Sequence, residues 1–352
     1  MSNILITGAA GYIGGTLLDV LLKQHKQGLE LGKLHVTVRT ADQASALSSI
    51  GATVIRVDLR DENAVKEAVV QHEIDIVIHC ASAIDASLAK SLIAGLQQRK
   101  KLTGNEAHFI HTSGASAYAD TEGWQHGPVK DTDAVYSLNK QIETPGLARD
   151  TDTAVLEYAV QCGVPAYSVN PPLVFGRGSG ASNQLSFTIP LFVRTFMRTK
   201  AVYKLPIENQ WSAVHVVDLA NYYVCILQAI KNGTPLPSGY DGYMFPSTHQ
   251  FSYSELLEHL AAALHEMGYI DSAEVKTWPS KEAACKDLGI GPEVLRTALC
   301  SNTIIIPVKG ETIGWKPEWN KERFLQNLKD EVKDVVELGA TSKMMTVSLA
   351  QD

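Results

Sequence analysis

The chain has 352 residues, of which 45% are hydrophobic and 20% are charged, and this composition excludes collagen, coiled coil and intrinsic disorder. Its length predicts one large α/β unit with an attached lobe, or two domains. The net charge of −7, without a Lys/Arg cluster, argues against nucleic acid or an anionic membrane as the main partner, so we expect a small-molecule substrate.

The cysteines and the first residues point to a reducing compartment. There are five cysteines, an odd number, and no CxxC pair, which argues against a disulfide framework or a zinc knuckle. The opening MSNILITGAAG lacks the basic segment and cleavage site of a signal peptide, and no apolar run is long enough to cross a membrane. We therefore expect a cytoplasmic protein. We also expect no metal site, because the sequence lacks residues at metal-ligand spacing.

Short β-branched runs alternate with amphipathic stretches over the first 112 residues. We expect strands at 3–7, 34–38, 53–57, 75–80 and 107–112, and helices at 12–25, 62–70 and 85–99. Strand and helix in turn predict βαβ crossovers and a parallel sheet. Because the strands near 76–78 and 109–110 are apolar on both faces, we expect helices to cover both sides of that sheet.

The periodicity lapses from residue 113 to residue 143, a Gly/Asp/Thr-rich stretch too long for an ordinary connection, which predicts a functional loop. A helix is then expected from an N-cap at Thr144 and Pro145 to Gly163. A strand at 166–169 precedes a glycine-rich turn at 176–180. Later helices are expected after residue 214, at 253–267 and at 321–338, with a loose tail from 339.

A glycine pattern marks the first strand-to-helix turn, where residues 7–14 read TGAAGYIG. Gly8 permits a tight turn, Gly11 lets the main chain approach a pyrophosphate, and Gly14 allows close helix packing. The N-terminus of the helix would face the negative charge. We therefore predict a dinucleotide site, with a tight βα turn that binds nothing as the alternative.

The residue after the second strand predicts which dinucleotide binds. An NAD site usually has an acid there, whereas this chain has Arg39, which suits a 2′-phosphate. We therefore expect NADP rather than NAD, unless Arg39 is only a solvated cation. Asp58, after the third strand, is a candidate partner for the adenine amino group or an N-cap of the next helix.

Several motifs in order resemble the extended short-chain dehydrogenase/reductase superfamily, in its NAD-dependent epimerase/dehydratase and dihydroflavonol-reductase-like branch. Besides the glycine turn they are Asp58-Leu59, HCASA at 79–83, HTS at 111–113, NPPLVFG at 170–176, VHVVDL at 214–219 and GWKP at 314–317. The resemblance implies a doubly wound Rossmann sheet, a smaller C-terminal α/β substrate lobe, a nicotinamide between them, and a homodimer.

The resemblance also implies domain boundaries and cofactor contacts. The Rossmann domain would comprise 1–176 and 212–234, the substrate lobe 177–211 and 235–338, and the tail 339–352. The implied cofactor-binding residues are Gly8, Ala10, Gly11, Tyr12, Ile13, Arg39, Asp58, Leu59, Cys80, Ala81, Ser82, Thr112, Pro171, Leu173 and Val174.

The catalytic residues depart from the family pattern, which has a Ser or Thr after strand five and a Tyr-x-x-x-Lys on the next helix. The tyrosine is the acid/base and the lysine lowers its pKa. Here Gly114 stands at the usual hydroxyl position, and Ser113 is one residue early. Family spacing places the tyrosine and lysine at Thr144 and Ala148.

The chain has a Tyr-x-x-x-Lys at Tyr136 and Lys140, ahead of the expected helix and separated from it by Pro145. We take Tyr136, Lys140 and Ser113 as the candidate catalytic residues, with a surface tyrosine as the alternative for Tyr136. Arg149 and Asp152, one turn apart on the next helix, are expected to form a surface pair.

Two kinds of function remain. The first is an NADP(H)-dependent oxidoreductase acting on a carbonyl or conjugated bond, with an epimerase or isomerase that recycles its cofactor as a close variant. The second is a non-catalytic NADP-binding redox sensor, motivated by Gly114 and Ala148. We favour the enzyme because a sensor has less need of a complete substrate lobe.

Overall fold

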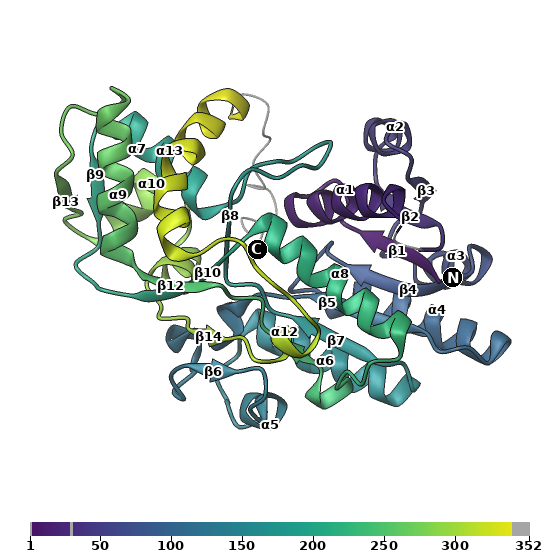
Figure 1. The fold of residues 1–352 in the computed structure, drawn as a ribbon. Helices are drawn as coiled ribbons and strands as arrows, with labels where there is room; N and C mark the ends of the chain where they lie inside the picture. The colour runs from purple at the N-terminus through teal and green to yellow at the C-terminus, as the bar shows by residue number, and fades with distance from the viewer. Residues whose placement is uncertain (1, 29–30, 340–352) are drawn as a thin grey trace.

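The computed structural model describes residues 2–28 and 31–339, and its centre is a seven-stranded sheet (Figure 1). The strands of the sheet are β1 (Asn3–Thr7), β2 (Leu34–Val38), β3 (Thr53–Arg56), β4 (Ile74–His79), β5 (His108–Thr112), β7 (Ala166–Val169) and β11 (Tyr243–Met244). Their order is β11-β7-β5-β4-β1-β2-β3, and all neighbours are parallel. This confirms the predicted doubly wound sheet, whose strand order reverses beside β1.

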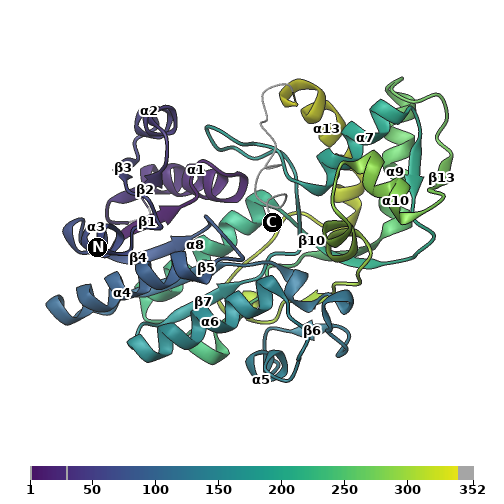
Figure 2. The same ribbon diagram turned by 180° about the vertical axis from the view of Figure 1, so that it is seen from behind.

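Helices cover both faces of the sheet, as Figures 1 and 2 show. One face packs against α1 (Tyr12–Lys26), α2 (Ala41–Ser49) and α8 (Val216–Asn232), and the other against α3 (Glu62–Gln71), α4 (Ala86–Thr103) and α6 (Leu147–Cys162). Because successive strand residues point to opposite faces, Ile4 and Ile6 join the first core while Leu5 joins the second. Strands with apolar residues on both faces therefore specify a sheet that is buried on both sides.

The predicted start of the helix at Thr144 and Pro145 is wrong, since α6 begins at Leu147 after an extended Gly146. The carbonyl of Thr144 accepts a hydrogen bond from the buried Arg149 guanidinium, which holds this stretch outside the helix. The sequence could not predict this contact, because its acceptor is a backbone carbonyl, which any residue supplies.

The β5–α6 connection, 113–146, contains short elements rather than a plain loop. They are η1 (Ala115–Tyr118), η2 (Asp120–Glu122), β6 (Val129–Lys130) and α5 (Val135–Asn139). Strand β6 pairs in parallel with β14 (Ile305–Ile306), so residues far apart in the sequence lie side by side there.

The C-terminal lobe lies beyond the carboxyl ends of the strands, at the left of Figure 1. One hydrophobic core joins its main elements, which are α7 (Thr188–Thr199), β9 (Val202–Lys204), β12 (His249–Ser252), α9 (Tyr253–Glu266), β13 (Val275–Thr277), α10 (Lys281–Leu288) and α13 (Lys321–Leu338). Strands β8 (Leu173–Phe175) and β10 (Gln210–His215) form a second sheet with β12 and connect the two parts. The remaining short elements are η3 (Gly239–Asp241), α11 (Pro292–Val294), η4 (Leu295–Leu299) and α12 (Lys309–Thr312).

The division between the two parts differs from the expected one. Strand β11, in the stretch expected to belong to the lobe, pairs with β7 and extends the Rossmann sheet. Trp315 also returns to this domain, where its indole N–H donates to the carbonyl of Asp218 at 2.9 Å. A strand of two residues carries no periodicity, so the sequence could not place it.

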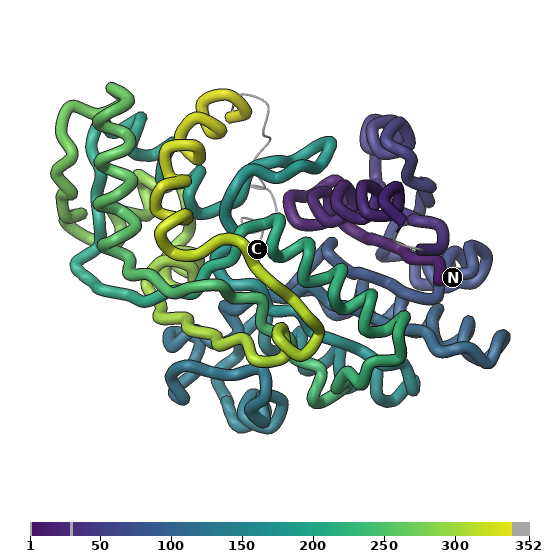
Figure 3. The backbone as a smooth tube through the Cα atoms, viewed as in Figure 1, coloured from purple at the N-terminus to yellow at the C-terminus, as the bar shows by residue number. Residues whose placement is uncertain are grey.

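The chain path is drawn as a tube in Figure 3, which shows α8 crossing beside α1. Within residues 2–28 and 31–339, no helix combines the length and apolar character needed to cross a bilayer. The predicted tail lies outside the described residues, except for Gly339.

Candidate functional site

Close backbone contacts define the β1–α1 turn. Gly8 has φ +71°, and a Cβ there would lie 2.5 Å from the carbonyl oxygen of Cys80. A Cβ on Gly14 would lie 2.4 Å from the carbonyl oxygen of Gly8, so a side chain fits at neither position. In this described turn Gly11 is the N-cap of α1 and provides no side-chain cap, and the first turn has no acid, which leaves the first N–H groups of α1 available to an anion.

The ends of β4 and β5 meet beside this turn. The Cys80 thiol lies 3.1 Å from the hydroxyl of Thr112, which lies 2.7 Å from the hydroxyl of Tyr223 on α8. Burial raises the pKa of Cys80 to about 11, so the thiol stays protonated and is not a nucleophile. Sequence reasoning found Cys80 and Thr112 but missed Tyr223, which lies far along the chain in an ordinary amphipathic helix.

The glycine-rich turn at 176–180 packs onto the start of α1. The Tyr12 hydroxyl donates to the carbonyl of Gly176 at 2.6 Å, and the N–H of Ser179 donates to the Thr16 hydroxyl at 3.3 Å. On its other side, the N–H of Gly176 donates to the carboxyl of Glu331 on α13 at 2.5 Å. Burial raises the pKa of Glu331 to about 7. The lobe therefore holds a segment that adjoins the expected diphosphate site.

The residues predicted to hold the adenosine lie at the same edge of the sheet. Arg39 follows β2 with an exposed side chain, while its N–H donates to Gln43 at 3.2 Å. The Asp58 carboxylate accepts the N–H of Arg60 at 3.0 Å. Asp61, not Asp58, caps α3, so the alternative assignment of Asp58 as an N-cap is wrong.

The other predicted cofactor residues also follow strand ends, except for two. Ala10 and Ile13 follow β1, Leu59 follows β3, Ala81 and Ser82 follow β4, and Pro171 follows β7, whereas Leu173 and Val174 lie within β8. Carboxyl ends of parallel strands are where α/β sheets bind ligands. The structure thus brings these residues to one edge, and their contacts with a cofactor stay predictions.

A polar cluster lies below the ends of β5 and β7, around the fully buried Asp152 of α6. Its carboxyl accepts from the Ser168 hydroxyl at 2.8 Å and from the Asn170 amide at 2.7 Å, and it lies 3.5 Å from Nε2 of His111. Burial raises the pKa of Asp152 to about 7, although the hydrogen bonds from Ser168 and Asn170 lower it. Burial lowers the pKa of His111 to about 3, so at neutral pH His111 is uncharged.

The expected surface pair of Arg149 and Asp152 is wrong, because both side chains are buried and bond to different elements. The Arg149 guanidinium donates to the carbonyl of Glu122 at 2.8 Å, and to those of Ala117 and Thr144. It therefore joins three parts of the β5–α6 connection to α6. The sequence missed this role because the partners are backbone carbonyls, which any residue supplies.

The three candidate catalytic residues are not brought together. The Tyr136 hydroxyl donates to Glu157 on α6 at 2.8 Å, and the Lys140 ammonium lies 3.1 Å from the same carboxylate. Burial and Glu157 raise the pKa of Tyr136 to about 12. Ser113 instead follows β5, where its N–H donates to the carbonyl of Val169 at 2.8 Å and its hydroxyl is buried without a hydrogen-bond partner among the described residues. Catalytic roles for Tyr136, Lys140 and Ser113 stay predictions.

The position expected to carry the substrate-binding hydroxyl has room for one. A Cβ on Gly114 would meet the Ser116 hydroxyl at an ordinary 3.6 Å. Ser116 is exposed, so its hydroxyl reaches solvent beside the gap that Gly114 leaves. Sequence reasoning missed Ser116 because it considered only residues at the end of the strand.

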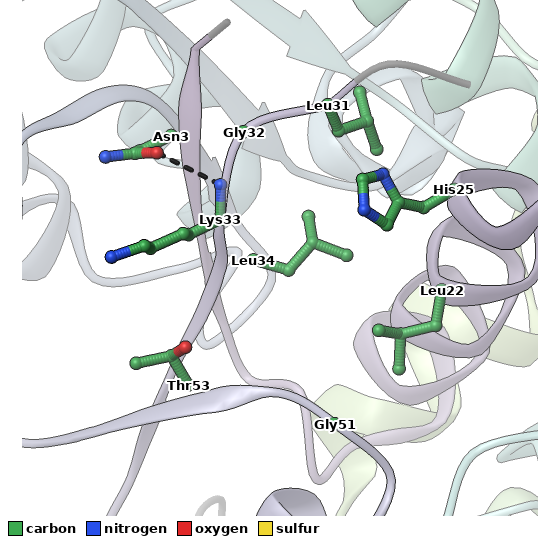
Figure 4. A pocket seen from close by; sticks show the side chains of 9 residues that line it. All are labelled: Asn3, Leu22, His25, Leu31, Gly32, Lys33, Leu34, Gly51 and Thr53. Atoms are coloured by element: carbon green, nitrogen blue, oxygen red, sulfur yellow. Dashed lines mark hydrogen bonds between the residues drawn. The ribbon is translucent and has the colours of Figure 1, made fainter. Parts of the chain in front are cut away.

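A pocket of about 540 Å³ lies at the opposite edge of the sheet (Figure 4). Asn3, Leu34 and Thr53, at or beside the starts of their strands, line it together with Leu22 and His25 of α1. It contains none of the predicted cofactor residues. Because α/β sheets bind ligands at the carboxyl ends of their strands, this pocket is not the cofactor site.

Comparisons with known proteins agree with this geometry. The NAD dependent epimerase/dehydratase family model matches residues 4–237. The chain is 25% identical to the oxidase ucsJ of Acremonium sp over 301 residues, 80% of this chain and 84% of that protein.

Two solved structures have a similar fold. One is UDP-glucose 4-epimerase of Thermotoga maritima, with TM-score 0.63, 18% identity, and coverage of 95% of this chain and 99% of that one. The other is yeast methylglyoxal/isovaleraldehyde reductase Gre2 with NADPH, with TM-score 0.64, 16% identity, and coverage of 96% and 99%. The predicted Rossmann fold and enzyme class are confirmed, and the chain belongs to the NAD dependent epimerase/dehydratase family.

Proposed function

We propose that the protein is an NADP(H)-dependent oxidoreductase that reduces a carbonyl or conjugated bond of a small organic molecule. The observation that carries this proposal is the β1–α1 turn, whose glycines admit a diphosphate, together with Arg39 at the end of β2. The nicotinamide would supply a hydride, and the protein would bind, orient and exclude water.

Three groups would hold the cofactor. The N–H groups after Gly11 would bind the diphosphate, Arg39 the 2′-phosphate, and Asp58 the adenine amino group. Arg39 supports NADP because its side chain is exposed and therefore open to a phosphate. Gre2, which has the same fold, was solved with NADPH.

The Arg39→Asp variant tests this choice. We expect its NADPH affinity to fall at least about tenfold relative to its NADH affinity, because a charge-assisted phosphate contact is replaced by repulsion. Isothermal titration calorimetry measures both. Lys33→Asp, the same charge change at the other end of β2, is the control. An unchanged preference in Arg39→Asp contradicts the NADP assignment.

The reaction is tested by steady loss of NADPH absorbance with a panel of aldehydes, ketones and enones. Net reduction consumes the cofactor, whereas an epimerase of the same family would recycle it within one turnover. Substrate conversion at constant absorbance would therefore replace the reductase by the epimerase.

We also propose a cytoplasmic homodimer. The five cysteines support the location, since none forms a disulfide within the described residues. Light scattering on the purified protein measures the mass, and a monomer would contradict the dimer.

A further inference from the structure

The hydroxyl groups near the carboxyl ends of the strands are candidates to bind a substrate oxygen. Hydride transfer to a carbonyl carbon places negative charge on the carbonyl oxygen, and a hydrogen-bond donor at that oxygen lowers the barrier. Such a donor must be accessible to a ligand, and it must not be committed to another acceptor.

Three of these hydroxyls fail one of the two conditions. The Thr112 hydroxyl is buried and lies 2.7 Å from the hydroxyl of Tyr223. The Ser113 hydroxyl is buried without a hydrogen-bond partner among the described residues, so a ligand cannot reach it. The Tyr136 hydroxyl donates to the Glu157 carboxylate at 2.8 Å. None of the three is therefore ready to bind a substrate oxygen.

Ser116 of η1 meets both conditions. It is exposed between the buried Ala115 and Ala117, and within the described residues its hydroxyl makes no hydrogen bond. The backbone is held on both sides, because the N–H of Ala115 donates to the carbonyl of Pro171 at 2.9 Å and the carbonyl of Ala117 accepts from Arg149 at 3.4 Å. The free hydroxyl therefore has a defined position.

Gly114 leaves a space beside the Ser116 hydroxyl. The backbone of Gly114 is extended, with φ −164°, so any residue could stand there without strain. A Cβ on Gly114 would lie 3.6 Å from the Ser116 hydroxyl oxygen, and beyond the chain neighbours no other atom of the described residues lies within 4 Å. A hydroxyl at position 114 and the hydroxyl of Ser116 would therefore face the same space.

This space lies at the edge of the sheet where the cofactor is expected. Gly114 follows the end of β5, and Pro171, which accepts the N–H of Ala115, follows the end of β7. The contact between Cys80 and Thr112 joins the ends of β4 and β5 beside it. Because α/β sheets bind ligands at the carboxyl ends of their strands, a substrate next to the nicotinamide would come close to Ser116.

We propose that the Ser116 hydroxyl binds the carbonyl oxygen of the substrate and stabilises the negative charge that develops on it during reduction, a role that rests on the proposed function. Ser116 is then a catalytic residue that supplies the hydroxyl which position 114 lacks. The hydroxyl has moved from residue 114 to residue 116, from the end of the strand onto η1.

The reaction step balances with NADPH and water. The carbonyl carbon accepts a hydride from NADPH, and the carbonyl π electrons move to the oxygen that Ser116 binds. The proton of the Ser116 hydroxyl passes to this oxygen as the product alcohol forms. Water in contact with the exposed serine returns a proton to the serine oxygen, and the buffer neutralises the hydroxide that this leaves.

Ser116→Ala tests the proposal with the best substrate of the carbonyl panel. We expect kcat/KM to fall about a hundredfold, because one lost donor to a developing oxyanion costs about 10²–10³ in rate. The NADPH affinity, measured by calorimetry, should change less than about twofold. Ser116→Thr keeps the hydroxyl and should retain at least about a third of the rate. Ser137→Ala, another exposed serine of the same connection, is the matched control and should keep the wild-type rate.

A second set of variants moves the hydroxyl back to position 114. Gly114→Ser fits the structure, because the backbone is extended and the Cβ has space. In the Ser116→Ala background it should recover at least about tenfold of the lost rate. Gly114→Ala in the same background adds the same Cβ without a hydroxyl and should recover none. Recovery by serine alone separates a chemical role from a structural one.

The outcomes separate this proposal from the proposed function. A wild-type rate in Ser116→Ala, equal losses in Ser116→Ala and Ser116→Thr, or no recovery by Gly114→Ser overturns the role of Ser116 alone. Recovery by Gly114→Ala as large as that by Gly114→Ser overturns it as well. Absence of turnover in wild type with every substrate of the panel overturns the proposed function, and the role of Ser116 with it.

Discussion

The β1–α1 turn and the β5–α6 connection lie at the same edge of one sheet, but different forces hold them. Backbone contacts set the first, where Gly8 and Gly14 leave no space for a side chain. Buried side chains of α6 set the second, because Arg149 bonds to carbonyls of the connection and Asp152 bonds beside it to Ser168 and Asn170. A binding turn can therefore be built locally, whereas the neighbouring polar cluster depends on the whole fold.

Gly8→Ala should break the first region. The new Cβ would require a left-handed backbone and would lie 2.5 Å from the Cys80 carbonyl oxygen. We expect the free energy of unfolding to fall by about 4 kcal/mol, with loss of NADPH binding. Urea denaturation and calorimetry measure the two effects.

Gly163→Ala is the matched control for Gly8→Ala. Gly163 has a similar φ of +63°, but a Cβ there meets nothing within 4 Å. Its cost should be about 1 kcal/mol, from backbone strain alone. Equal losses in the two variants would show that the contact with Cys80 does not matter.

Arg149→Ala should break the second region. It removes a buried guanidinium and leaves the carbonyls of Ala117, Glu122 and Thr144 without that donor. We expect a loss of about 3 kcal/mol and faster proteolysis within 113–146. Arg296→Ala removes a partly exposed arginine that pairs with Glu293 and Glu122 and donates to the carbonyl of Thr121, and it should cost about 1 kcal/mol. A smaller loss for Arg149 than for Arg296 would contradict this difference.

The predictability of the fold follows the same division. Strand and helix periodicity placed β1, β2 and α13 at their observed bounds, because each buries apolar residues at a regular spacing. The two-residue strands β6, β11 and β14 have no such spacing, and their partners are distant in the sequence. Tertiary contacts alone make them strands.

The candidate site divides in the same way. Glycines and strand ends mark where a dinucleotide can approach, and the structure collects these residues at one edge. The partners of Asp152 and Tyr136 depended on how α6 turns beneath the sheet and where α5 lies beside it. A motif such as Tyr-x-x-x-Lys gives the spacing of two residues, but it does not predict which carboxylate accepts the hydrogen bond from the tyrosine hydroxyl.

The buried carboxyl of the second region should make stability depend on pH. The folded pKa of Asp152, about 7, exceeds its unfolded value near 3.9, so the folded state binds more protons between them. Stability from this group is present below about pH 4 and is lost as pH rises to about 7, by up to about 1.4 kcal/mol per pH unit.

The Asp152→Asn variant isolates that dependence. Thermal unfolding of wild type and variant at matched pH values should give curves that converge at low pH, with the variant relatively more stable near pH 7. Glu331, whose pKa is also raised to about 7, contributes equally to both proteins and cancels in the difference. Parallel curves would mean that Asp152 is ionised in the fold.

Tyr12→Phe tests whether the first region is independent of the lobe. Tyr12 lies in the glycine turn, yet its hydroxyl donates to Gly176, whose N–H is held by Glu331 of α13. Loss of this bond should lower the free energy of unfolding by about 1 kcal/mol. Tyr203→Phe is the control, because within the described residues its hydroxyl makes no hydrogen bond.

The NADPH affinity of Tyr12→Phe then shows whether the diphosphate site depends on the contact with the lobe. We expect a change of less than about threefold, which is under 1 kcal/mol, since the contacts of Gly8 and Gly14 set the backbone and Tyr12 only adds a tie to the lobe. A loss of tenfold or more would mean that α13, acting through Gly176, positions the diphosphate site. The two regions would then both depend on the whole fold, and the contrast between them would be one of degree.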